Sequence, residues 1–155
     1  MKGRTIKFLT LLTGLVLSIS LLFGCTNQQD FAAQEKIDLD ETIEKSIISD
    51  FVMAHADDQY PPTEDNVSLR CYGAFDDVYV MFIDVADWMY AAVIGKEVVA
   101  GVEFVYSYAA HVMEVYSDGK FYSLSEAYKK HILSRSDLKQ VQANYIADHE
   151  YLYQG

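Results

Sequence analysis

The feature that most restricts how this chain can fold is its amino terminus, where basic residues precede a single short apolar run. Lys2, Arg4 and Lys7 are followed by residues 8–23, which carry no charge. A transmembrane helix needs about 20 consecutive apolar residues, so this run is too short to span a bilayer. A basic segment followed by a short apolar core is typical of a signal peptide. We therefore expect the folded part of the protein to begin after residue 24.

The apolar run ends in Leu22-Phe23-Gly24-Cys25, which resembles the lipobox of bacterial lipoproteins. The match rests on Leu22, Gly24 and the position of the cysteine; Phe23 stands where that family usually has a small residue. The resemblance implies a diacylglyceryl group on Cys25 and cleavage before it. Two acyl chains supply the stable anchoring that one chain does not. We expect the protein on the outer face of the cytoplasmic membrane, or at the outer membrane where the host has one; the alternative is an uncleaved anchor with an incidental cysteine.

The net charge restricts the classes of partner that the mature chain can bind. The net charge is -11, and cleavage after residue 24 would remove three basic residues and no acid, which leaves 131 residues with a charge of -14. Nucleic-acid binding needs concentrated Lys and Arg, so this balance argues against it. Anionic headgroups would repel such a surface, which leaves the lipid on Cys25 as the expected membrane contact.

The predicted organisation is a signal peptide over residues 1–24, a lipidated N-terminus and linker over 25–37, and one α+β domain over 38–155. The predicted domain has an N-terminal amphipathic helix, an antiparallel sheet of about four to five strands, and short C-terminal helices. Apolar residues recur at every fourth position of the first helix: Leu39, Ile43, Ile47 and Phe51. We expect Asp38 to cap this helix and the helix to end near His55.

Turn signals divide the middle of the chain into strands. Asp76-Asp77 and Asp118-Gly119 each separate β-rich runs and predict hairpins. Gly95-Lys96 is expected to form another turn. Ser123 with Glu126 has the pattern of a capping box, and Ser136 is expected to cap the last helix. The predicted strands are 68–75, 78–85, 88–94, 102–106, 112–116 and 121–122.

The C-terminal half resembles small secreted or lipid-anchored bacterial domains over about residues 68–140. The resemblance is carried by Ala100-Gly101-Val102-Glu103-Phe104, Asp118-Gly119-Lys120-Phe121-Tyr122, Ser123-Leu124-Ser125-Glu126-Ala127-Tyr128, Leu133 and Asp137-Leu138-Lys139. It implies the fold and the compartment, and it adds no catalytic residue.

Candidate site residues are of two kinds, polar side chains and tyrosines, and no cofactor is expected. An acidic loop could hold a hard cation such as calcium, although its spacing is not that of an EF-hand; the alternative is a solvated acidic loop. Its residues are His55, Asp57, Asp58, Glu64 and Asp65. Asp84 and Asp87 beside Trp88 form a further polar group.

Tyrosines form the second candidate group. Tyr106, Tyr116 and Tyr122, with Tyr108, could line a peptide- or sugar-binding face, because tyrosine suits partner surfaces; the alternative is core and cross-strand packing. Cys71 has no intrachain partner once Cys25 is lipidated, and it is expected to be a buried small apolar residue rather than a reactive thiol.

The function expected from these features is a lipid-anchored, non-catalytic binding or interaction module with a protein, peptide or sugar partner. Motifs for a nucleophile elbow, a phosphate loop and a paired-cysteine centre are missing from the sequence. Two alternatives stay open: a cell-envelope hydrolase with a dispersed Asp/Glu/His site, and a domain stabilised by a cation in the 55–65 loop.

Overall fold

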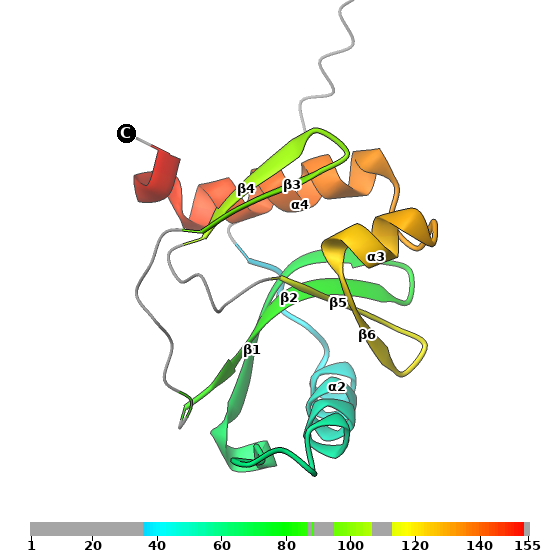
Figure 1. The fold of residues 1–155 in the computed structure, drawn as a ribbon, viewed down its shortest axis with the longest axis vertical. Coiled ribbons are helices and arrows are strands. Elements are labelled where there is room, and N and C mark those ends of the chain that lie inside the picture. Colours follow the sequence, from blue (N-terminus) through cyan, green and yellow to red (C-terminus); the bar gives the residue numbers. More distant parts are fainter. Residues whose placement is uncertain (1–35, 87, 89–94, 107–112, 154–155) are drawn as a thin grey trace, which may run out of the picture. The chain divides into compact units, whose positions relative to one another are not determined.

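In the computed structural model of this chain, the described residues are 36–86, 88, 95–106 and 113–153, and they belong to one unit that runs from Ala32 to Gly155. They form a four-stranded antiparallel sheet, a two-stranded sheet and short helices, which confirms the α+β class (Figure 1). The elements are α2 (Glu41–Ala54), η1 (Glu64–Asn66), β1 (Val67–Phe75), β2 (Val78–Val85), β3 (Gly95–Val99), β4 (Val102–Tyr106), β5 (Glu114–Ser117), β6 (Lys120–Ser123), α3 (Leu124–Lys129), α4 (Arg135–Asp148) and η2 (Glu150–Tyr153).

The larger sheet has the order β1-β2-β5-β6, and both of its tight hairpins were predicted from the sequence. Asp118 and Gly119 both have positive φ, 52° and 71°, as the two central residues of a type I′ turn require. Strands β3 and β4 lie between β2 and β5 in the chain but pair with each other as a separate sheet. The predicted turn at Gly95-Lys96 is wrong, because both residues lie in β3 and pair with β4. Positions 89–94 of the predicted 88–94 strand lie outside the described residues.

One face of the larger sheet is covered by α2. Ile47 and Phe51 are buried there in one cluster with Cys71 of β1 and with Met81 and Ile83 of β2. The helix cap is Asp40, whose side chain accepts a hydrogen bond from Thr42 N at 2.9 Å, and not Asp38 as expected. The sequence alone does not distinguish the two positions, because Asp38 and Asp40 are equally good capping residues.

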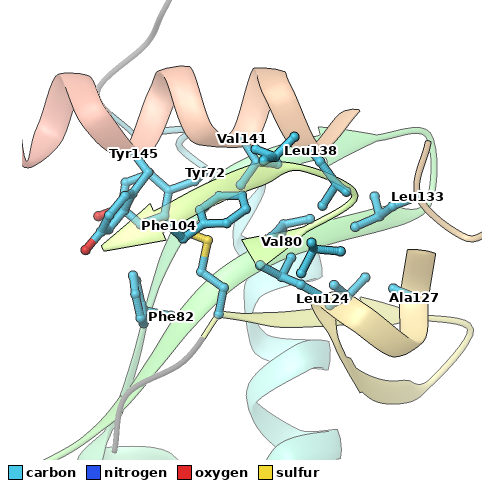
Figure 2. Packing of buried hydrophobic residues seen from close by; sticks show 14 of the residues in the cluster. Tyr72, Val80, Phe82, Phe104, Leu124, Ala127, Leu133, Leu138, Val141 and Tyr145 are labelled. Atoms are coloured by element: carbon cyan, nitrogen blue, oxygen red, sulfur yellow. The ribbon is translucent and has the colours of Figure 1, made fainter. Parts of the chain in front are cut away.

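The opposite face of the sheet carries α3, α4 and the β3–β4 hairpin (Figures 1 and 2). Leu138, Val141 and Tyr145 of α4 are buried in this second core. Helix α3 begins at Ser123 with the predicted capping box. The cap of α4 is Ser134 and not Ser136: Ser134 Oγ accepts from Asp137 N, and Asp137 Oδ2 accepts from Ser134 N.

A β-bulge in β1 provides contacts between the sheet and α4. Cys71 is opposite Met81 and Gly73 is opposite Val80, so Tyr72 has no partner residue in β2. The Tyr72 carbonyl instead accepts a hydrogen bond of 2.8 Å from the buried side-chain amide of Asn144 in α4. One turn earlier on α4, Val141 packs so closely against Gly73 that a Cβ there would lie 2.6 Å from Val141 Cγ2.

We predict that Gly73→Ala lowers the free energy of unfolding by about 1–3 kcal/mol, the usual cost of an added methyl group in a filled core. Urea denaturation measures this change. In a Val141→Ala background the cost of Gly73→Ala should be smaller, because the nearest clashing methyl group is gone, and the difference is a coupling energy between two contacting residues. An equal cost in both backgrounds would contradict the close contact.

Candidate binding site

The polar residues that stand out from the rest of the fold gather at the C-terminal end of α2. They come from the C-cap of α2, from the loop after it, from the segment that follows β2 and from the start of β5. We call the group His55, Asp58, Trp88 and Glu114 the Glu114 site. Asp58, Trp88 and Glu114 are each separated by 26 or more positions in the sequence. The fold, and not the local sequence, therefore brings them together.

His55 is held in place from two sides. It is the C-cap residue of α2, and its ring packs on Phe51 with centroids 4.4 Å apart. Its Nδ1 lies 2.7 Å from Asp58 Oδ2, in the turn that ends the helix. A carboxylate on one ring nitrogen fixes the orientation of an imidazole and leaves the other nitrogen for a further contact.

The indole ring of Trp88 lies beside the imidazole ring of His55. The two rings are 5.7 Å apart in an edge-to-face arrangement, and Trp88 also lies 6.1 Å from Phe51. Trp88 Nε1 donates a hydrogen bond of 3.0 Å to the carbonyl of Tyr60, which fixes the indole over the proline-containing loop. This is the single tryptophan of the chain.

Glu114 is a carboxylate on an otherwise apolar face. It begins β5 directly opposite the fully buried Met81, whereas its neighbour Val115 points into the other core. Within the described part of the chain, the Glu114 carboxylate has no hydrogen-bond or salt-bridge partner. Burial raises its pKa above the usual value, and the opposing charge of His55 lowers it in part. The fold therefore keeps an incompletely solvated acid beside an oriented histidine.

The chemistry available at the Glu114 site is hydrogen-bond acceptance and proton exchange. A neutral His55 and the Glu114 carboxylate can both accept hydrogen bonds from a bound group. The thiol of Cys71 is a poor nucleophile, because burial raises its pKa to about 11 and its Sγ donates to the Gly73 carbonyl at 3.2 Å.

The predicted cation site is only partly assembled. His55 and Asp58 are in contact, whereas Glu64 and Asp65 lie in the first turn of η1 and Asp57 is exposed. Over the described ranges, no three His, Cys, Asp or Glu side chains are grouped as a metal site requires. Of the other polar pair, Asp84 accepts a hydrogen bond of 3.1 Å from Arg70, and Asp87 lies outside the described residues.

The three candidate tyrosines do not share a surface. Tyr106 is 2% exposed and donates to Glu97 at 3.0 Å. Tyr116 packs on the α2 face and donates to Asp50, whereas Tyr122 belongs to the opposite core. Neighbouring strand positions point to opposite faces, and Tyr122 pairs with Val115 and not with Tyr116. Tyr108 lies outside the described residues.

A cavity of about 180 Å³ lies at the other end of α2, between residues 36–39, Glu44 and β1 residues 69–71. Its two basic groups are already paired: Lys36 lies 3.6 Å from Asp38, and Arg70 lies 3.1 Å from Asp84. We regard the Glu114 site as the better candidate, because its charges are not balanced in this way.

Sequence reasoning missed Glu114. The signal that could have identified it is an acid inside the β-rich run 112–116, where the flanking residues are apolar. An acid in such a strand is normally assigned to the solvent face. That assignment fails here because α2 covers the face on which Glu114 lies.

No protein-family model, curated protein or solved structure matches the chain. No helix within the described residues is long and apolar enough to cross a bilayer. Cys25 lies outside those residues, so the lipid-anchor prediction is carried forward as a proposal.

We predict that Glu114→Gln raises the free energy of unfolding at pH 7 by about 0.5–2 kcal/mol, the usual size of a single stabilising substitution. Because the pKa of Glu114 is raised in the folded state, its ionisation destabilises the fold above the ordinary pKa of 4.5. The gain should therefore disappear below about pH 4, where both side chains are neutral.

Urea titrations at pH 7 and pH 3.5 measure this difference. The matched control is Glu150→Gln, which removes an exposed carboxylate at the start of η2, on the other side of the sheet, and should not stabilise the protein. A Glu114→Gln variant that is less stable than the parent at pH 7 would refute the unfavourable burial of this carboxylate.

Proposed function

We propose that this protein is a lipid-anchored extracytoplasmic binding module that is held to the membrane through Cys25 and engages its partner at the Glu114 site. The anchoring part is supported by the Leu22-Phe23-Gly24-Cys25 segment after a short uncharged apolar run. The high acidity of the remaining chain supports a lipid rather than an electrostatic attachment, since anionic headgroups repel it.

The observation that carries the binding part is the position of Glu114. Glu114 is partly buried. Partly removing an ionised group from water without a partner costs free energy, and proteins keep such groups mainly where function needs them. Elsewhere in the described core the buried polar groups are satisfied, as with Asn144, which donates to the Tyr72 carbonyl and accepts from Gln140. A ligand that supplies a hydrogen-bond donor would complete the Glu114 site in the same way.

A binding role fits this geometry better than a hydrolytic one. His55 and Glu114 could exchange protons with a bound group, but a catalytic site also needs an activated nucleophile or an oriented water. The Cys71 thiol, with a pKa near 11, does not supply that nucleophile. We therefore assign His55 and Glu114 to ligand recognition.

Anchoring is tested by Cys25→Ser in the full chain. We predict that this variant moves from the membrane fraction to the soluble extracytoplasmic fraction and no longer incorporates labelled palmitate, because the thiol that carries the lipid is gone. The matched control is Cys71→Ser, which changes the other cysteine and should remain with the membrane. Equal membrane association of Cys25→Ser and the parent protein would overturn the anchor.

Binding at the Glu114 site is tested by labelling the full chain with 5-fluorotryptophan, since its single ¹⁹F resonance reports on Trp88. In detergent micelles, a solubilised envelope extract from the native host is expected to shift or broaden this resonance. The effect should be lost in Glu114→Gln and kept in Glu150→Gln. A resonance that the extract leaves unchanged, or changes equally in both variants, would exclude this surface as the binding site.

A further inference from the structure

The Glu114 site has more negative than positive groups, so it lacks a positive charge. Asp58 and Glu114 contribute two carboxylates, and the base that acts on Glu114 in the described part of the chain is His55. Its Nδ1 is already engaged by Asp58 Oδ2 at 2.7 Å. Even a protonated His55 therefore balances one of the two carboxylates and leaves the site net negative.

The negative charge of the whole chain also favours a cationic ligand. A net charge of -11, or -14 after cleavage at Cys25, raises the local concentration of cations and repels anions before they reach the surface. Phosphate, sulfate and carboxylate groups are therefore disfavoured as ligands, while a cation is attracted.

Aromatic rings provide the remaining contacts. Trp88 stands beside His55, and Phe51 lies within 6.1 Å of Trp88 and 5.7 Å of Phe121, so the apolar side of the site is built from ring systems. An organic cation gains from such surroundings, because the stem of the cation packs on the rings and its charge is attracted by their negative faces. A small hydrated metal ion does not use this surface.

Resting on the binding role proposed above, we infer that the Glu114 site binds an ammonium or guanidinium group, presented either by a lysine or arginine side chain of a partner protein or by a free polyamine. The cationic head bonds the Glu114 carboxylate, and the aliphatic stem lies against Trp88. This assignment satisfies the carboxylate that the described residues leave without a partner, and it uses the histidine, the acid and the ring together.

The test titrates the full chain, labelled with 5-fluorotryptophan and held in neutral detergent micelles at low salt. The probes are N-acetyl-lysine methylamide and N-acetyl-arginine methylamide as side-chain mimics, and spermidine as a free polyamine. N-acetyl-norleucine methylamide has nearly the same stem without the charge, and N-acetyl-glutamate methylamide carries the opposite charge.

We expect the cationic probes to shift the Trp88 resonance in a saturable manner and the norleucine and glutamate probes to leave it unchanged. Glu114→Gln should weaken binding of the cation at least 10-fold, whereas Glu150→Gln, which removes the same single negative charge from the chain, should weaken it less than 2-fold. Tighter binding of the amino-acid probes than of spermidine assigns the group to a protein partner, and the reverse order assigns it to a polyamine.

Two failures are distinguishable. If the envelope extract moves the Trp88 resonance but the cations do not, or if they act equally on Glu114→Gln, the site binds a ligand of another class and the inferred cation is wrong. If neither the extract nor any probe moves the resonance, the binding role of this surface is overturned as well.

Discussion

The bulge at Tyr72 is the constraint on which both cores depend. Before it, β1 residues such as Cys71 face the α2 side, opposite Met81; after it, Gly73 faces the α4 side, opposite Val80. The extra residue thus shifts the alternation of β1 by one position, so that odd-numbered residues face the α2 side before the bulge and the α4 side after it. The Tyr72 carbonyl that the bulge releases is bound by Asn144, and the hydroxyl of the same residue donates to Asp148, so α4 is fixed to β1 at two points separated by one helical turn.

The position of α4 in turn holds the β3–β4 hairpin. The outer edge of β4 is satisfied by side chains and not by a further strand: Tyr145 Oη donates to the Val105 carbonyl at 3.0 Å, and Val105 N donates to Tyr153 Oη at 3.1 Å. Arg135, at the start of α4, donates to the Ala100 carbonyl in the β3–β4 turn. A two-stranded hairpin is rarely stable alone, so these bonds and the shared core explain why it persists.

The sequence predicts elements whose signals are local and misses what depends on the fold. Asp118-Gly119 and the Ser123–Glu126 pattern were identified correctly, because a type I′ turn and a capping box are decided within four residues. The place of Gly95 and Lys96 in β3, where they pair with β4, was missed, because a glycine followed by a lysine has the composition of a turn. His55 and Asp58 were predicted as neighbours and are in contact, whereas Glu114 comes within electrostatic range of His55 only because β5 pairs with β2 in the sheet that α2 covers.

The two ends of α2 have different roles in this arrangement. At its N-terminal end, Ile37 N donates to the Cys71 carbonyl at 2.9 Å, so the chain joins the β1 edge just before the helix begins. At its C-terminal end, His55 opens the Glu114 site. Fourteen helical residues separate the two ends by about 20 Å. The described chain therefore enters the domain at the end of α2 that lies away from His55, and the helix that covers one core also separates this entry point from the Glu114 site.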